Sequence, residues 1–236
     1  MERKILYILI ILNLLAVKTL IAQEELPKNW NSEKIKGARF IPYATYQGSP
    51  FLSEGFEPGS IEMSDGTSIN GMQLRYSSYL DELIYYNTDI STQIIVDRVN
   101  LKGFSMTDER GIKRTFRQQV YDGPMPGNRF FEILSEGDVS LLVHRKVLLL
   151  TCPIYGEVGK EKNISYQEAY NYFLFNKEKG YKLIKISKNS FLSLFNSSNQ
   201  KLVKKMLRKN NISIKDENSF IKAWNLLREN NLAINF

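Results

Sequence analysis

Short alternating segments joined by glycine-containing turns constrain the fold of this chain more than any other feature. The dipeptide Asp65-Gly66 lies between two segments in which apolar and polar residues alternate. This pattern predicts a β-hairpin with a tight turn. In the second segment Ile69 is out of phase with Met72, and Asn70-Gly71 lies between them. Because three residues are too few for a separate strand, we expect a β-bulge there.

Further β segments of similar length follow. They are expected at residues 82–87, 92–101, 103–107 and 113–121, and in two more hairpins at residues 130–144 and 170–186. No long helical pattern separates them. This favours an antiparallel sheet or a small barrel and argues against a parallel nucleotide-binding sheet.

After Ser187 the apolar residues recur with the period of a helix. Two helices are expected, the first capped by Ser197 or Ser198 and the second beginning after Asp216. Their apolar stripes are Leu202, Val203, Met206 and Leu207 in the first helix and Phe220, Trp224 and Leu227 in the second. The predicted fold class is therefore α+β: an antiparallel β-rich sheet or small barrel followed by two C-terminal amphipathic helices.

The N-terminus carries the pattern of a secretory signal peptide. Glu2-Arg3-Lys4 precedes an apolar run at residues 5–17 that only Asn13 interrupts. Ala22 stands directly before the polar segment that begins at Gln23, so we expect cleavage between these two residues. The run is shorter than the about 20 residues that a membrane-spanning helix needs, which disfavours the alternative of an uncleaved anchor.

These patterns divide the chain into four parts. Residues 1–22 are the expected signal peptide, 23–38 a flexible arm, 39–187 the β-rich domain and 188–236 a C-terminal helical cap. No later segment is long and apolar enough to span a membrane as a helix. We therefore expect an exported protein with no transmembrane span in the mature chain. Its expected location is the periplasm or the outer membrane, with secretion as the alternative.

Composition excludes several classes of site. His144 is the only histidine and Cys152 the only cysteine among the 236 residues, so a disulfide within one chain and a two-histidine zinc motif are excluded. The net charge is +7, but export argues against a nucleic-acid partner. We expect no cofactor, no bound metal and no catalytic residue.

His144 and Cys152 admit catalytic interpretations that the surrounding pattern does not favour. Strict alternation places His144 on the same strand face as Leu142, and no Gly-x-Ser-x-Gly elbow accompanies it. Cys152 follows an apolar run, where burial would raise the pKa of its thiol and leave it inert. Structural roles are the favoured interpretation for both residues.

Three adjacent carboxylate pairs could suggest hydrolysis by general acid and base. Neighbouring strand residues point to opposite faces, so such pairs do not converge by themselves, and the third pair also fits the start of a helix. The isolated aspartates are interpreted as turn formers. The pairs are Asp81-Glu82, Asp108-Glu109 and Asp216-Glu217, and the turn formers are Asp65, Asp122 and Asp138.

Two surface features are candidates for binding. The loop Asp122 to Asn128 contains two prolines and two glycines and either presents Met125 to a partner or simply connects two strands. The first terminal helix is strongly basic and suits an anionic lipid or polysaccharide, although a solvated outer face is the favoured interpretation. Its basic residues are Lys201, Lys204, Lys205, Arg208 and Lys209.

Four motifs, together with the signal peptide and the Lys-rich helical tail, resemble a family of uncharacterised exported proteins of Bacteroidetes. The motifs are Ser64 to Thr67, Asn70 to Tyr76, Phe131 to Leu134 and Val139 to Leu141, and the likeness covers roughly residues 58 to 231. The resemblance implies a periplasmic or outer-membrane-associated setting and brings no catalytic residue with it.

The resulting functional prediction is an exported envelope protein with a non-enzymatic binding or structural role. Its expected partner is an envelope protein or a polysaccharide of unknown identity. The alternative is a carboxylate-dependent hydrolase of the periplasm, with carboxylates that the fold brings together.

Overall fold

The structure is a computed structural model that describes residues 35–124, 126–153, 162–230, 232, 234 and 235. The expected signal peptide at residues 1–22 and residues 23–34 of the expected arm lie outside this part of the chain. The strands are β1 Gly37–Arg39, β2 Glu57–Met63, β3 Ser68–Ser77, β4 Glu82–Asn87, β5 Thr92–Val96, β6 Leu101–Thr107, β7 Lys113–Tyr121, β8 Gly127–Ser135, β9 Ser140–His144, β10 Val147–Pro153, β11 Lys162–Glu168, β12 Asn171–Asn176 and β13 Gly180–Ile184.

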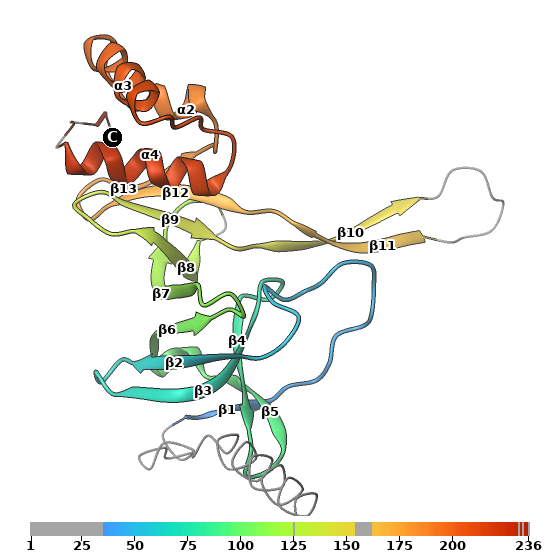
Figure 1. The fold of residues 1–236 in the computed structure, drawn as a ribbon. Helices are drawn as coiled ribbons and strands as arrows, with labels where there is room; N and C mark the ends of the chain where they lie inside the picture. Colours follow the sequence, from blue (N-terminus) through green and yellow to red (C-terminus); the bar gives the residue numbers. More distant parts are fainter. Residues whose placement is uncertain (1–34, 125, 154–161, 231, 233, 236) are drawn as a thin grey trace, which may run out of the picture.

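One large sheet dominates the fold. It contains eleven antiparallel strands in the order β1-β5-β4-β3-β2-β6-β7-β8-β9-β12-β13, and β10 and β11 form a separate two-stranded sheet that projects from it (Figure 1). Because β1 and β13 lie at opposite ends of the order, the sheet is open. The predicted α+β class is confirmed, with a sheet and not a barrel.

The first predicted hairpin and its bulge are both confirmed. Strands β2 and β3 flank the turn at Asp65-Gly66, where the Thr67 N–H donates to Asp65 Oδ1 at 2.8 Å. Their register skips one residue, since Gly59 pairs with Met72 but Ile61 pairs with Ile69. Gly71 takes a φ of 69° in the bulge, a left-handed conformation that favours glycine.

Residues 92–101 do not form the single strand expected. Asp97 ends β5 and its side chain accepts a hydrogen bond from the Val99 N–H, which caps the short 3-10 helix η1, Arg98–Asn100, before β6 begins. A short polar side chain that bonds its own backbone competes in this way with strand pairing. The sequence patterns do not predict the separate β10–β11 hairpin, although β10 contains the apolar run that precedes Cys152.

Three helices follow the sheet, where two were expected. They are α2 Lys188–Leu192, α3 Ser197–Lys209 and α4 Glu217–Glu229. Asn196, and not Ser197 or Ser198, caps α3, because its side-chain oxygen accepts from the Asn199 N–H. The predicted start of α4 is confirmed by a capping box between Asp216 and Ser219.

The apolar residues form separate clusters on the two halves of the sheet. The larger cluster is built by strands β2 to β8 and includes Ile61, Tyr76 and Phe104. The second lies between the helices and the strands β9, β12 and β13, and contains Trp224 at 1 % exposure. Figure 1 shows α4 lying across these strands, with α2 and α3 farther out.

The boundary of the predicted arm needs correction. Ile35 is buried in the larger cluster, and Gly37 pairs with Val96 as β1 joins β5. Residues 35–38 therefore belong to the β-rich part of the chain and not to a flexible arm ending at residue 38. Burial of Ile35 and the pairing of β1 with β5 at the edge of the sheet provide the contacts that order this segment.

Candidate functional site

Strands β8, β9, β12 and β13 carry different residues on their two faces. Leu142 pairs with Ile133 on one side and with Phe173 on the other, and these residues point away from the helices. His144 is two residues from Leu142 on the same strand, so it shares this face, as its alternation predicts. Its ring centroid lies 5.8 Å from that of Phe131.

Aromatic rings cover this face of the sheet. Phe131 stacks on Tyr181 with centroids 5.3 Å apart, and Phe173 meets Phe131 edge-on at 5.6 Å. Tyr121, from the end of β7, contacts Phe131, Phe173 and Tyr181. We call Tyr121, Phe131, Phe173, Phe175 and Tyr181 the aromatic face. Leu183 beside it is 64 % exposed, so no described helix covers this side of the sheet.

A cavity of about 350 Å³ lies at the end of the aromatic face, where the β3–β4 turn approaches it. We call it the His144 pocket. Three features singled out in the sequence meet there: the only histidine, one member of an acidic pair, and the proline- and glycine-rich loop. The lining residues are Ser78, Tyr79, Leu80, Asp81, Tyr121, Pro124, Arg129, Phe131, His144, Lys146, Asn171, Phe173 and Leu183.

Asp81 is buried in the β3–β4 turn with a φ of 61°, an uncommon conformation for a residue other than glycine. Its carboxylate accepts hydrogen bonds from Tyr76 Oη at 2.5 Å and from Arg98 Nη2 at 3.0 Å. The Phe130 N–H donates to it as well. Burial raises the pKa of the Asp81 carboxyl, although Arg98 opposes this shift. The arrangement holds the turn in place.

His144 lies beside Asp81 without a hydrogen bond to it. Its Nε2 is 4.0 Å from Asp81 Oδ1, and its side chain is 13 % exposed. Burial, together with the positive charges of Arg129, Lys146 and Arg98, lowers the pKa of the imidazole to about 4. His144 is therefore neutral at pH 7.

Two polar atoms of the pocket are buried and lack a hydrogen-bond partner among the described residues: Nε2 of His144 and Oγ of Ser78. Unsatisfied buried polar groups are rare, since each costs about 1–3 kcal/mol. Ser78 therefore does not form a nucleophile–base pair with His144 in this structure. Ser78 was not singled out in the sequence, because no local pattern distinguishes it from its neighbour Ser77.

The three acidic pairs do not form a shared site. Asp108 accepts hydrogen bonds from the backbone of Arg110 and Ile112 in an exposed turn, and Asp216 caps α4. Glu82 accepts a hydrogen bond from Tyr43 Oη at 3.3 Å. The turn interpretations of the isolated aspartates remain predictions, apart from Asp65.

Cys152 and the loop Asp122 to Asn128 are described only in part. The Cys152 backbone pairs with Asn163 between β10 and β11, but its side chain lies outside the described residues, as does Met125. The loop connects β7 to β8, and its last two residues already belong to β8. Pro124 lines the His144 pocket.

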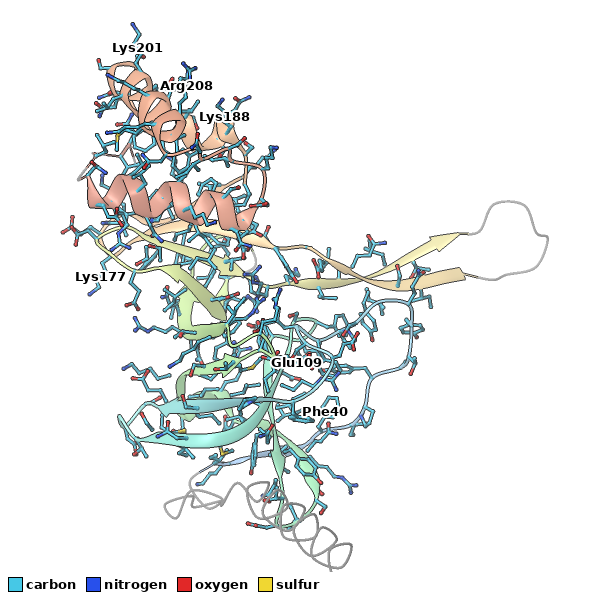
Figure 2. The ribbon with its side chains drawn as sticks, viewed as in Figure 1. Phe40, Glu109, Lys177, Lys188, Lys201 and Arg208 are labelled. Carbon is cyan, nitrogen blue, oxygen red and sulfur yellow. The ribbon has the colours of Figure 1, made fainter. Side chains whose placement is uncertain are left out.

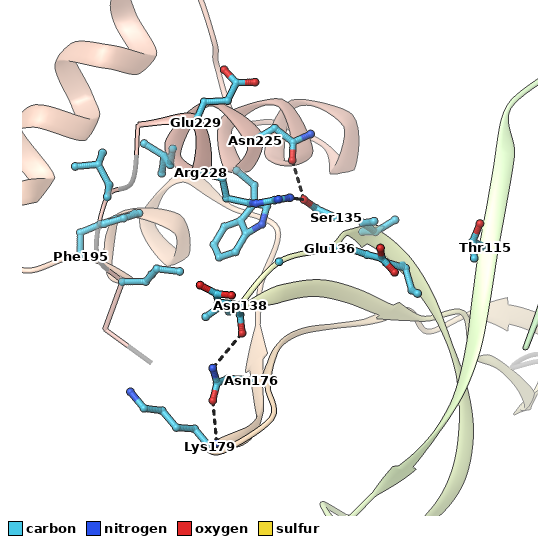
Figure 3. Close-up of a pocket in the computed structure, with 18 of the residues that line it drawn as sticks. Thr115, Ser135, Glu136, Asp138, Asn176, Lys179, Phe195, Asn225, Arg228 and Glu229 are labelled. Atoms are coloured by element: carbon cyan, nitrogen blue, oxygen red, sulfur yellow. Dashed lines mark hydrogen bonds between the residues drawn. The ribbon is translucent and has the colours of Figure 1, made fainter. Parts of the chain in front are cut away.

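A larger cleft of about 1380 Å³ lies between α4 and the turns of the β8–β9 and β12–β13 hairpins (Figure 3). Ser135 Oγ donates to Asn225 Oδ1 at 2.8 Å and accepts from Arg228 Nη1. Asn176 Nδ2 donates to the carbonyl of Asp138 at 3.0 Å. Ser135, Asn225, Arg228 and Asn176 thus have hydrogen-bond partners within this cleft, whereas Ser78 Oγ and His144 Nε2 in the His144 pocket have none among the described residues.

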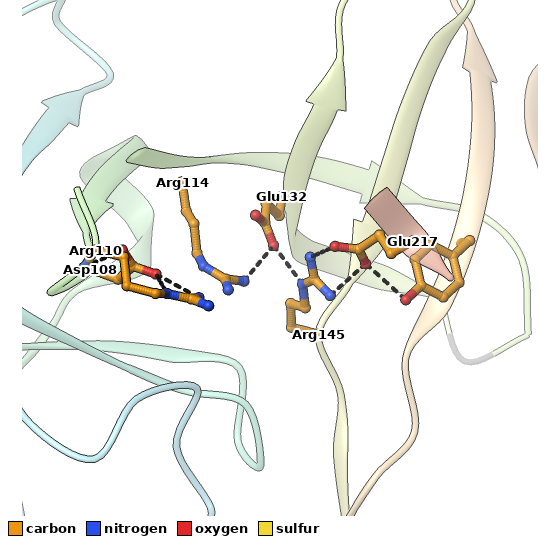
Figure 4. A network of polar contacts seen from close by, with 7 residues as sticks. Asp108, Arg110, Arg114, Glu132, Arg145 and Glu217 are labelled. Atoms are coloured by element: carbon orange, nitrogen blue, oxygen red, sulfur yellow. Dashed lines mark hydrogen bonds and ion pairs between the residues drawn. The ribbon is translucent and has the colours of Figure 1, made fainter. Parts of the chain in front are cut away.

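A buried ion network joins the sheet to α4 (Figure 4). Arg145 donates through Nε to Glu132 and through both Nη atoms to Glu217, at 2.7 and 2.8 Å. Tyr172 Oη also donates to Glu217 at 2.8 Å. Burial raises the pKa of Glu217, but the hydrogen bonds and charge of Arg145, together with the Tyr172 hydroxyl and the charge of Arg114, hold that pKa below its ordinary value. The guanidinium between the carboxylates makes this a structural network.

Comparison of the chain with protein-family models, curated proteins and solved structures finds no match. In the part of the chain that the structure describes, no group of three or more His, Cys, Asp and Glu side chains is placed to hold a metal ion. No helix within the same part is long and apolar enough to cross a membrane.

Proposed function

We propose that this chain is an exported envelope protein that binds a small organic anion in the His144 pocket without transforming it. The observation that carries the proposal is the pair of buried, unpartnered atoms, Ser78 Oγ and His144 Nε2, at one cavity. A ligand oxygen that accepts from the Ser78 hydroxyl, or from His144 with its proton on Nε2, would remove the penalty of leaving that atom unsatisfied.

Charge favours an anion as the ligand. Arg129 and Lys146 line the pocket, and with Arg98 they make the potential at the imidazole positive. Asp81 is the carboxylate that lines it, and this residue is already bonded by Tyr76 and Arg98. A carboxylate on the ligand would form a charge-assisted contact with Lys146.

The rest of the pocket favours an apolar body attached to that anion. Phe131 and Phe173 form one wall and belong to the aromatic face, and Leu183 leaves the rim open to solvent. The volume of about 350 Å³ is near the lower end of the range of ligand pockets, about 300 to 1,000 Å³. An aromatic or branched aliphatic carboxylate fits this combination.

A binding role is favoured over hydrolysis by the orientation of the polar groups. In a hydrolytic triad the carboxylate accepts from one imidazole nitrogen and the nucleophile bonds the other. Here the carboxylate of Asp81 lies 4.0 Å from His144 Nε2, too far for a hydrogen bond, and no described nucleophile bonds that nitrogen. The carboxylate-dependent hydrolase remains an alternative prediction that no described group of carboxylates favours.

Export is the part of the proposal that rests on the sequence. The charged N-terminus, the short apolar run at residues 5–17 and Ala22 support it. The ligand would then be met outside the cytoplasm.

The test is isothermal titration calorimetry, in which the mature protein is titrated with phenylacetate and, separately, with its neutral amide, phenylacetamide. We expect phenylacetate to bind at least about tenfold more tightly, because one charge-assisted contact contributes about 1.5–3 kcal/mol. Lys146→Met should weaken phenylacetate binding, whereas Lys113→Met, a change to an exposed lysine of β7, should not. Equal binding of acid and amide would contradict the anionic class. Absence of binding by either compound, or binding that Ser78→Ala leaves unchanged, would contradict the pocket.

A further inference from the structure

The positive charge of the chain is concentrated in one segment. Ten of the 32 Lys and Arg residues lie between residues 179 and 215, and none of the 25 Asp and Glu residues does. Without this segment the chain would be net acidic. We call residues 179–215 the basic segment; it comprises β13, α2, α3 and the turns beside them.

The basic side chains of the helices lie at the outer surface. Val203 and Leu207 are buried on the inner side of α3, so the lysines between them face outward. Figure 2 shows Lys188, Lys201 and Arg208 at the helical end of the molecule, on α2 and α3 beyond α4. The exposed basic residues of α2 and α3 are Lys188, Lys201, Lys204, Lys205, Arg208 and Lys209.

These charges are not balanced within the described protein. None of the ion pairs among the described residues involves a side chain of α2 or α3. On α3, Lys201 stands four residues before Lys205, and Lys204 four before Arg208. Like charges at this spacing repel and destabilise a helix. An ordinary solvated helix face carries both positive and negative charges. This face carries only positive charges, which favours contact with a negatively charged partner.

An apolar side chain lies within the same surface. Leu202 is 45 % exposed on α3, between Lys201 and Lys205 in the sequence. A polysaccharide chain would contact the lysines through its charges alone. A bilayer surface offers anionic headgroups to the lysines and acyl chains to a leucine in their midst.

We infer that α2 and α3 dock this protein onto an anionic membrane surface. The lysines approach the phosphate groups of the lipids, and Leu202 enters the boundary between headgroups and acyl chains. α4 is not part of this contact, since it packs on the sheet. This inference does not depend on ligand binding in the His144 pocket.

The experiment is co-sedimentation of the mature protein with vesicles of phosphatidylglycerol and phosphatidylethanolamine, compared with phosphatidylcholine alone. We expect binding to the anionic vesicles and its loss as the salt concentration rises, because exposed charges are screened. The double variant Lys204→Glu, Lys205→Glu should bind the anionic vesicles at least about tenfold more weakly than the parent protein does. The control, Lys36→Glu, Lys113→Glu, makes the same change in net charge at exposed positions elsewhere and should bind as the parent does.

Leu202→Ser separates a lipid surface from a polyanion. It should weaken vesicle binding but leave retention on a heparin column unchanged, since only the membrane offers an apolar contact. Equal losses in the two double variants, equal binding to both kinds of vesicle, or heparin retention without vesicle binding would each overturn the inference. Thermal unfolding of every variant verifies that it is folded.

Discussion

Replacement of Trp224 by alanine tests whether the helices form an integral cap on the sheet. The indole is 1 % exposed and lies in the cluster formed by the helices and strands β9, β12 and β13. A buried tryptophan removes about 150–250 Å² from water, which at about 25 cal/mol per Å² corresponds to about 4–6 kcal/mol. Truncations of this kind measure about 3–5 kcal/mol.

Two features of Trp224 place the expected loss near the lower end of that range. Its Nε1 has no hydrogen-bond partner among the described atoms, so truncation breaks no hydrogen bond and removes an unsatisfied donor. The side chain also borders the larger cleft, where neighbouring groups can relax. We expect a loss of about 3 kcal/mol in the free energy of unfolding, equivalent to a fall of about 6–12 °C in Tm for a chain of this size.

Urea unfolding followed by far-UV circular dichroism is the suitable assay, because the signal does not depend on the residue removed. The matched control is Leu202→Ala on α3, where the side chain is 45 % exposed and the expected loss is below about 1 kcal/mol. A Trp224→Ala loss as small as that of the control would refute the cap. A separate unfolding transition of the helices at a lower urea concentration, with the sheet still folded, would refute the cap as well.

Three further outcomes are expected. Arg145→Met should destabilise the protein by about 3 kcal/mol in urea unfolding, because it leaves the partly buried Glu217 without a cation and the buried Glu132 with only Arg114, at 3.4 Å; a loss below about 1 kcal/mol would contradict the network. Folding lowers the pKa of His144 from its ordinary value of 6.5 to about 4, so protonation of the imidazole favours the unfolded chain. The neutral imidazole therefore contributes to stability fully above pH 6.5, and this contribution of about 3 kcal/mol is lost as the pH falls toward 4. His144→Gln should flatten this part of the stability–pH curve, and an unchanged slope would show that another group causes it. N-terminal sequencing of the envelope form should begin at Gln23, whereas a retained Met1 would exclude cleavage.

Local patterns were sufficient for those elements whose contacts are close in the sequence. The β2–β3 hairpin depends on Asp65-Gly66 and the bulge on Gly71, both of which act within a few residues. The start of α4 depends on Asp216 and Ser219, three residues apart. Strand alternation likewise predicted which face His144 occupies. In each case the interaction that determines the structure is short-range and depends on residue type.

The sequence was less informative where a local competitor or a distant partner decided the outcome. Asp97 interrupts the segment 92–101, whose pattern predicts one strand, because its side chain accepts a hydrogen bond from the Val99 N–H. Strand β11 has a polar composition, and its pairing with β10 provides its hydrogen bonds. Pairing with β5 likewise orders Gly37 and Ala38, which the composition indicates to be the end of a flexible arm.

The candidate site was decided by tertiary structure alone. Ser78 and Asp81 belong to the β3–β4 turn, whereas His144 ends β9, and only the tertiary fold brings them to one cavity. The network of Glu132, Arg145 and Glu217 has the same origin, because its members come from β8, the β9–β10 connection and α4. The sequence determines side-chain chemistry and local spacing. Burial arises only when distant segments pack together, and it is burial that lowers the pKa of His144 and leaves its Nε2 without a partner among the described residues.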